Sequence, residues 1–504
     1  MKVFIFRFNS LMLIEIIRRL KRAGVEVLYW EGSKHNFDAL SEDVEFKDTI
    51  FHNTYDAVRA IPPKNIDMAS IDPIDKNLII KLCRHESQIL SMMTGVDYDK
   101  TPFLRKRHVY YEYLKYAHGL LKFLKPDVII FGDVPHIVHQ FVFYIVAKIL
   151  GIKTIFFRLT QVHGRLFFSD DIENYSAFQE LFEKYKDKEI FLEDLSKDIR
   201  KYYLLQTNLK QDATPFYMEK SYREKLKSTT QFFSKPKKII GHIRQGTFLI
   251  TSILYIKSLI RRRRVASLEN RTFSGLRMKY EAFKSQRIKN KFKQEYYSLI
   301  KPIDFSKKYV YVALHKQPEA STSAMGGVFT DQILMVDILS QSIPEDWVLY
   351  VKESVMQWEA PRGELGRYNG YYHDLKMRDN ICFVDAELDT FKLIKNAQAV
   401  ATVTGTVGWE SVLRGKPALI FGYIWYMYCD GVFQLEDVSS CQKAIDMIEK
   451  GAKPDRNKVL KYLYVLDKLT IRGFPNIRYQ KDSGVTVEEN IANITKALQE
   501  KLLT

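Results

Sequence analysis

The sequence predicts an α/β protein made of two Rossmann-like halves joined by a helical, basic region. Short strands rich in β-branched and aromatic residues alternate with helical patterns at both ends of the chain, which is typical of parallel sheets. That strand pattern is absent from about Ser169 to Lys308, and 504 residues are too many for one ordinary core. We therefore expect α/β domains over 1–168 and 309–504, a helical segment over 169–308, and a final helix that can pack back on the first domain.

Composition favours a cytoplasmic protein. Hydrophobic residues make up 46% of the chain, which excludes wholesale disorder. The N-terminus enters a strand without the features of an export signal, and no apolar run approaches the roughly 20 residues of a membrane-spanning helix. We expect a reducing compartment and no metal site, because neither metal-ligand spacing nor a paired pattern is present among Cys83, Cys382, Cys429 and Cys441.

The formal net charge of +17 is concentrated in one segment. Between Lys235 and Lys308 there are 20 Lys and Arg but only 4 Asp and Glu. Within 235–264, an apolar stretch lies between two basic clusters, which is typical of a segment lying on an anionic membrane. An inter-domain helix with a solvated basic face is an equal alternative. Neither interpretation favours a nucleic-acid partner, which the net charge alone would suggest.

The first half begins with a β-α-β unit. Its elements are a strand at Lys2–Phe6, a helix at Ser10–Ala23 and a strand at Val25–Trp30. Residues 7–9, Arg-Phe-Asn, replace a glycine-rich phosphate loop, so we do not expect this turn to bind a dinucleotide. The helical patterns between Asp38 and Lys100 cannot be ordered from sequence.

Two polar segments follow strands later in this half. The predicted elements are a helix at Tyr110–Leu124, a strand at Val128–Phe131, a helix at Val138–Leu150 and a strand at Thr154–Phe157. Asp133 and His136 follow one strand at its carboxyl end, where open α/β sheets place functional groups. The loop from Arg158 to Arg165, which includes Gln161, leaves the next strand at the same edge.

Three loops of the second half are expected to meet in one crevice. Strands are predicted at Tyr309–Leu314, Trp347–Val351, Ile381–Val384 and Ala399–Val403, with helices at Asp331–Ser340 and Thr390–Lys395. The loops after three of these strands contain His315–Ser323, Lys352-Glu353 and Thr404–Glu410. Because carboxyl ends of parallel strands lie at one edge, these loops converge.

The turn at Thr404–Glu410 has the pattern of an anion site. A β-branched strand ends in Thr-Gly-Thr and a helix follows, so free amides and a helix dipole face the sheet edge. Glu410 lies one helical turn further in, within reach of ribose hydroxyls. No Walker-type motif is present, which disfavours nucleotide hydrolysis. This half is therefore predicted to bind a nucleotide sugar.

Each of these residues also has a structural interpretation. Glu410 can be an ordinary helix residue, His315 a loop histidine and Asp133 a strand-end cap. Lys352 and Glu353 can pair with one another. An aromatic cluster can form the wall beside a base or simply pack in the core; it consists of Tyr423, Trp425, Tyr426 and Tyr428.

The segments His315–Ser321, Lys352-Glu353 and Gly405–Glu410 resemble the capsular polysaccharide biosynthesis proteins related to bacterial Kdo transferases. The resemblance covers mainly 309–437, with weaker support from 126–165. It implies a GT-B-like architecture, with two Rossmann-like domains facing a cleft, and transfer of a sugar from a nucleotide-activated donor such as a CMP-linked ulosonic acid. One departure is Ser354-Val355, where the family commonly has His-Pro. A histidine contact to the donor is therefore missing or comes from elsewhere, such as His315.

Together these features favour a metal-independent glycosyltransferase of surface or capsular polysaccharide synthesis, peripheral on the inner face of the cytoplasmic membrane. No cofactor is expected besides the nucleotide sugar, which is a substrate. The predicted donor-binding residues are His315, Gln317, Glu319, Lys352, Glu353, Gly405, Thr406 and Glu410. A glycan or lipid-linked glycan acceptor is expected to bind the first domain through Arg158, Gln161 and Arg165.

Two candidates for catalysis face this acceptor. Asp133 or His136 would act as general base, or Asp133 as nucleophile if configuration is retained. The alternatives to glycosyl transfer are a nucleotide-sugar epimerase of the same fold and a non-catalytic scaffold for polysaccharide assembly.

Overall fold

A computed structural model describes residues 1–208 and 272–503, except 64–65, 68, 70, 96 and 98–100, together with 253, 256–257, 260 and 262–264. Most of the predicted membrane-associating segment, 235–264, therefore lies outside the described residues. None of the helices in the described ranges combines the length and the hydropathy that a bilayer crossing requires.

The N-terminal domain is built on a seven-stranded sheet in the order β15-β6-β5-β4-β1-β2-β3. Its strands are β1 (Lys2–Phe6), β2 (Glu26–Gly32), β3 (Ile50–Asn53), β4 (Val128–Phe131), β5 (Lys153–Leu159), β6 (Arg165–Ser169) and β15 (Ile471–Arg472). The first five are parallel, whereas β6 runs antiparallel to β5, and β15 runs antiparallel to β6. Phe6 of β1 pairs with Phe131 of β4, so the loops after these two central strands lie side by side.

Helices cover both faces of this sheet. Alternate residues of β1 point to opposite faces: Val3 and Ile5 pack under one helical layer, Phe4 and Phe6 under the other. The first layer contains α1 (Leu11–Arg22) and α24 (Val487–Leu503); the second contains α5 (Glu86–Thr94), α6 (Phe103–Leu124) and α7 (Val138–Leu150). Shorter helices are α2 (Lys34–Leu40), α3 (Thr54–Ala57) and α4 (Lys76–Leu82).

Two boundaries in this domain differ from the prediction. The helix expected at Tyr110–Leu124 begins earlier, at Phe103. The loop expected from Arg158 to Arg165 is shorter, because Arg158 still belongs to β5 and Arg165 already begins β6. The strand β6 pairs with β5 in an antiparallel hairpin, so the predicted loop is its turn.

The C-terminal domain is a six-stranded parallel sheet in the order β11-β10-β9-β12-β13-β14. Its strands are β9 (Tyr309–Ala313), β10 (Val348–Lys352), β11 (Ile381–Phe383), β12 (Ala399–Thr402), β13 (Ala418–Ile420) and β14 (Val432–Gln434). The helices are α15 (Ala320–Met325), α16 (Gln332–Ser342), α17 (Met356–Glu359), α18 (Tyr371–Leu375), α19 (Thr390–Asn396), α20 (Thr406–Leu413), α21 (Val438–Glu449) and α22 (Arg456–Leu469). The parallel order brings the loops after β9 and β12 together.

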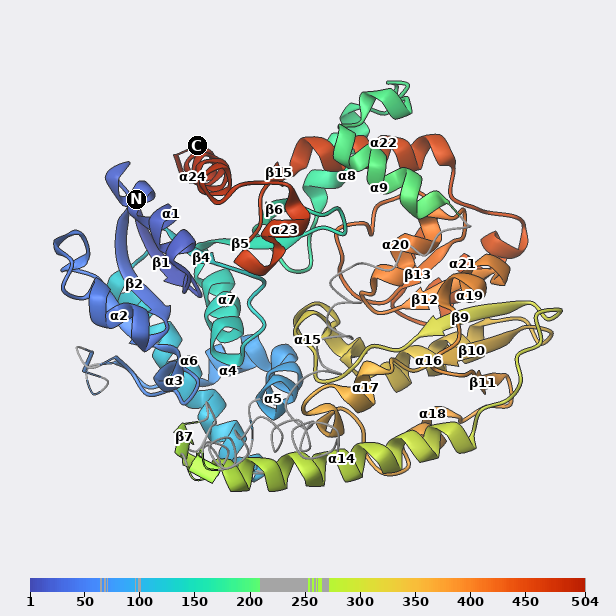
Figure 1. The fold of residues 1–504 in the computed structure, drawn as a ribbon, viewed down its shortest axis with the longest axis horizontal. Coiled ribbons are helices and arrows are strands. Elements are labelled where there is room, and N and C mark those ends of the chain that lie inside the picture. Colours follow the sequence, from blue (N-terminus) through green and yellow to red (C-terminus); the bar gives the residue numbers. More distant parts are fainter. Residues whose placement is uncertain are drawn as a thin grey trace, which may run out of the picture.

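In the part of the chain that connects the two sheets, each described helix packs on one domain or the other. The connecting elements are α8 (Ser176–Lys184), α9 (Lys197–Thr207), the strands β7 (Arg262–Arg264) and β8 (Thr272–Ser274), and α14 (Gly275–Ser298). In Figure 1, α8 and α9 lie beside α22 and α20, and α14 runs along the lower edge of the C-terminal domain. After α22 the chain returns through β15, α23 (Gln480–Ser483) and α24 to the N-terminal domain. The result is a GT-B-like α/β protein with two Rossmann-like domains.

The aromatic cluster near residue 425 packs in the core. Trp425 and Tyr426 are fully buried, and the Trp425 ring lies 5.0 Å from that of Trp409. Its contacts extend to Phe178 of α8, at 5.8 Å between ring centroids, and the Phe178 ring in turn lies 5.2 Å from that of Phe167 in β6. These rings join the two domains.

Candidate functional site

A cleft of about 670 Å³ lies between the two domains. It is lined by loops that follow β4, β5, β9 and β12, and by the returning segment near α23. Eight predicted site residues line it, namely Asp133, His136, Arg158, Gln161, His315, Glu319, Gly405 and Thr406. The remaining five lie behind its walls, namely Arg165, Gln317, Lys352, Glu353 and Glu410.

Asp133 and His136 form the part of the N-terminal wall that follows β4. The Nδ1 of His136 donates to the carbonyl oxygen of Val134 at 2.7 Å, and its Nε2 accepts from Nη1 of Arg7 at 2.9 Å. Burial lowers the pKa of His136, so the ring is neutral and both nitrogens are engaged. The Asp133 side chain is 54% exposed. It is therefore the freer base of the two.

Sequence reasoning missed Arg7. It is the first residue after β1 and has a left-handed backbone conformation, with φ of 64°. Its Nη1 lies 4.0 Å from Oδ2 of Asp133, so one guanidinium faces both predicted catalytic residues. The available signal was its position at the carboxyl end of a strand that neighbours β4.

The hairpin turn after β5 joins the walls of the cleft. Arg158 is only 6% exposed, and its guanidinium carbon lies 5.8 Å from the centre of the Tyr175 ring. Gln161 accepts a hydrogen bond from Nε1 of Trp425 at 2.7 Å, which ties this turn to the C-terminal domain. Two of the three predicted acceptor residues, Arg158 and Gln161, thus line the cleft, and Gln161 also bridges the domains.

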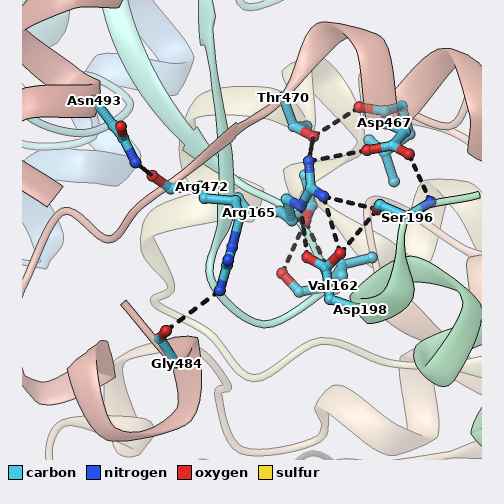
Figure 2. Close-up of polar contacts among 11 residues, drawn as sticks. Val162, Arg165, Ser196, Asp198, Asp467, Thr470, Arg472, Gly484 and Asn493 are labelled. Atoms are coloured by element: carbon cyan, nitrogen blue, oxygen red, sulfur yellow. Dashed lines mark hydrogen bonds and ion pairs between the residues drawn. The ribbon is translucent and has the colours of Figure 1, made fainter. Parts of the chain in front are cut away.

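Arg165 has a structural role instead (Figure 2). Its Nε donates to Asp198 at 2.7 Å and its Nη1 lies 3.0 Å from Oδ1 of Asp467. Burial would raise the pKa of Asp198, but the hydrogen bonds from Arg165 and Ser196 and the charge of Arg165 together lower it to about 2. Arg165 therefore clamps the β5–β6 hairpin to α9 and α22, and it is not exposed to an acceptor.

On the C-terminal wall, His315 connects the loops after β9 and β12. Its Nε2 accepts from the Thr404 amide at 3.3 Å and lies 2.9 Å from Oγ1 of Thr402. Since Nε2 accepts from an amide, the proton is on Nδ1, which lies 3.5 Å from Oε2 of Glu319. Burial would raise the pKa of Glu319, but the hydrogen bonds from His315 and Thr322, together with the positive charge of Lys316, lower that pKa.

The amino end of α20 opens into the cleft without a side-chain cap. Its N-cap is Gly405, where an added Cβ would lie 2.6 Å from Oγ1 of Thr402 and 3.3 Å from the His315 ring. The Gly405 amide donates to Thr402 at 3.2 Å, while Thr406 and Val407 line the cleft. The first amides of a helix have no intrahelical partner, so this end attracts an anion.

Glu410 lies one layer behind this helix end. It is 8% exposed, and its Oε1 accepts from Oγ1 of Thr406 at 3.2 Å. Burial raises the pKa of Glu410. Any influence of this carboxyl on a ligand passes through the Thr406 hydroxyl, whereas the sequence placed Glu410 itself on the ribose.

Lys352 and Glu353 do not line the cleft and do not pair with one another. The Nζ of Lys352 donates to Thr390 at 2.9 Å and to the Leu388 carbonyl. The fully buried Glu353 accepts from Arg367 and from Tyr372, each at 2.8 Å. These two residues therefore stabilise the C-terminal domain through internal contacts.

Arg367, which the sequence did not reveal, holds the His315 loop from behind. Its Nη2 donates to the His315 carbonyl at 3.0 Å, and its Nε binds Glu353. Gln317 is held in the same way, because its amide and carbonyl bind the side chain of Gln357 at 2.7 and 2.8 Å. Within the described ranges, no group of three or more His, Cys, Asp or Glu is arranged to hold a metal ion.

No protein-family model and no curated protein matches the chain. Similar solved structures include UDP-GlcNAc 2-epimerase from Methanocaldococcus jannaschii, with 13% identity and a TM-score of 0.24 over 91% of this chain and 95% of that chain. The beta Kdo 2,7 transferase KpsC of Thermosulfurimonas dismutans has 11% identity and a TM-score of 0.31 over 98% and 99%. UDP-GlcNAc 2-epimerase from Neisseria meningitidis, bound to UDP-GlcNAc, has 12% identity and a TM-score of 0.22 over 100% of both.

Proposed function

We propose that this protein is a glycosyltransferase that moves a sugar from a nucleotide-activated donor to a hydroxyl of a surface polysaccharide or its precursor. One observation carries the proposal: the uncapped end of α20 and the exposed carboxylate of Asp133 line the same cleft from different domains. An anion site and a base on two walls suit a reaction between two substrates.

The C-terminal wall would bind the donor. The amides of Thr406 and Val407 would receive its phosphate, and they would stabilise the charge that builds there as the sugar leaves. The Thr406 hydroxyl, oriented by Glu410, would contact the ribose. His315 would hold this turn in place through Thr402 and Thr404.

The N-terminal wall would bind the acceptor. Asp133 would take the proton of the acceptor hydroxyl while that oxygen bonds to the anomeric carbon, and the bond to the nucleotide phosphate would break with its electron pair on phosphate. His136 is a poorer base because Arg7 already occupies its Nε2. It would position the loop that contains Asp133.

A nucleotide-sugar epimerase is the second candidate. The carboxylate of Glu319 lines the cleft from the wall opposite Asp133, so two proton-transfer groups face one space. Such a pair could remove and return a proton on a single bound sugar, with no acceptor.

Calorimetric titration with CMP, UDP and GDP tests the nucleotide site. We expect one of them to bind; binding of none would contradict both enzymatic proposals and favour the scaffold. Incubation with the matching nucleotide sugars then separates the two enzymes. Donor consumed only when a glycan acceptor is added supports the transferase, whereas isomerised donor without acceptor supports the epimerase.

Peripheral binding to an anionic membrane through 235–264 remains part of the proposal for a lipid-linked acceptor. Flotation with vesicles of anionic lipid tests it. Binding that disappears in neutral vesicles is the expected result, and no binding to either would remove this element.

A further inference from the structure

One buried arginine on the N-terminal wall has no anionic partner. Four arginines in the described part of the chain are buried, and three of them pair with a carboxylate: Arg59 with Asp56, Arg165 with Asp198, and Arg367 with Glu353. The fourth is Arg158. No acidic side chain among the described residues pairs with it, and its buried Nε donates no hydrogen bond.

An unpaired buried charge is unfavourable, so Arg158 needs a physical reason. Removing a guanidinium from water without a counter-charge costs several kcal/mol in general. The Tyr175 ring gives only partial compensation, since its centroid is 5.8 Å from the guanidinium carbon. Arg158 lines the cleft, so an anion that enters the cleft can supply the missing partner.

The sheet register places this arginine beside the proposed base. In the parallel pair of β4 and β5, Phe131 is opposite Phe156. Two residues further along each strand direction come Asp133 and Arg158, both at the carboxyl edge and both lining the cleft. A group held by Arg158 would therefore lie next to the hydroxyl that Asp133 deprotonates.

We infer that Arg158 is the binding site for an anionic group of the acceptor, either a sugar carboxylate or a phosphate. The planar guanidinium can donate two parallel hydrogen bonds to either group. This inference rests on the proposed function, in which the donor phosphate occupies the amino end of α20. It identifies the acceptor class as acidic.

Ligand-observed NMR titration of the full-length protein tests the site with three probes. These are methyl glucuronide, methyl glucoside and methyl phosphate, at low ionic strength. We expect at least one anionic probe to bind tenfold or more tightly than the neutral glucoside. The preferred probe distinguishes the source: glucuronide indicates an acidic sugar, and methyl phosphate indicates a phosphorylated precursor. Equal binding of all three would overturn the inference.

Variants assign the preference to the residue. Arg158→Met should abolish the anion preference, and Arg158→Lys should keep part of it. The matched control is Arg478→Met, which removes an exposed arginine that also lines the cleft and should keep the preference. Loss in the control and not in Arg158→Met would place the anion elsewhere.

Two further measurements complete the test: thermal unfolding of the Arg158→Met variant, and anion binding in the presence of a nucleotide. Methionine fills the space of the arginine stem without the charge, so Arg158→Met should unfold at the same or a higher temperature. A lower temperature with the anion preference intact would make Arg158 structural. The preference should persist with a saturating nucleotide; if the nucleotide abolishes it, Arg158 contacts the donor and the inference fails. Anion preference without any nucleotide binding would instead contradict the proposed function alone.

Discussion

The two walls of the cleft differ in how completely their ionisable side chains are paired. On the C-terminal wall, both nitrogens of His315 face a partner, and Glu319 accepts from Thr322 at 2.6 Å. On the N-terminal wall, Arg158 has no anionic partner within the described chain and Asp133 is half exposed. The side chains of the C-terminal wall are therefore preorganised around the open amino end of α20, whereas Arg158 on the N-terminal wall requires a counter-charge from the ligand.

The largest expected effect on activity comes from Asp133 on the N-terminal wall. Asp133→Asn removes the proposed base and should lower turnover by about 10²- to 10⁴-fold, with little change in nucleotide affinity. Steady-state rates and calorimetry measure the two quantities. Asp127→Asn is the matched control, because Asp127 precedes the same strand at its other end, where it binds the Lys2 amide at 2.7 Å. Equal loss in both variants would contradict the role of Asp133.

Substitutions behind the C-terminal wall should instead change the stability of the protein. Arg367→Met leaves the fully buried Glu353 without its cation, and we expect the free energy of unfolding to fall by about 3–5 kcal/mol. Urea unfolding followed by tryptophan fluorescence measures it. Arg378→Met removes an exposed pair with Asp337 and should cost less than about 1 kcal/mol. A similar loss in the two variants would show that burial is not the cause.

A smaller effect is expected from crowding the donor site. Gly405→Ala adds a Cβ 2.6 Å from Oγ1 of Thr402, in a backbone conformation that alanine tolerates. Displacing that hydroxyl should weaken nucleotide binding by about 1–3 kcal/mol. Adding Thr402→Ala to the same chain removes the clashing atom and should restore part of the affinity. If the single variant binds normally, the turn is not the nucleotide site.

The smallest expected effect is a pH dependence of stability that comes from Lys352, behind the C-terminal wall. Burial lowers the pKa of Lys352 from 10.5 to about 8. Between these values the unfolded chain binds more protons than the native one, so this residue makes stability rise with pH from 8 to 10.5. The gain should be about 1 kcal/mol, because partial exposure screens it. Urea unfolding across this range should show the rise in the wild type and not in Lys352→Met, with Lys395→Met as the surface control.

Much of the architecture could be predicted because it depends on local patterns. The alternation of strands and helices indicated both parallel sheets, and the position of loops at carboxyl edges brought Asp133, His315 and Thr406 to one cleft. The alternation of side chains along a strand could have improved the prediction at the end of β10. Since successive residues point to opposite faces, Lys352 and Glu353 could not both have faced a ligand.

The missed residues depend on contacts that sequence does not reveal. Arg367 lies in an irregular segment far along the chain from His315, whose loop it holds. The difference between Arg165 and Arg158 is also invisible in the sequence. The two arginines differ because Asp198 and Asp467, which are distant in the sequence, form ion pairs with Arg165 and not with Arg158.

The returning C-terminal segment has a consequence for how the chain folds during synthesis. Ile491, Ile494, Leu498 and Leu502 of α24 complete the same core as β1 and α1. These residues follow both sheets in the chain, so the sheet that is synthesised first keeps one face incomplete until α24 has also been made. The C-terminal sheet lacks this dependence, since its strands lie between residues 309 and 434. The domain made second can therefore complete its core first, which reverses the usual order of folding on the ribosome.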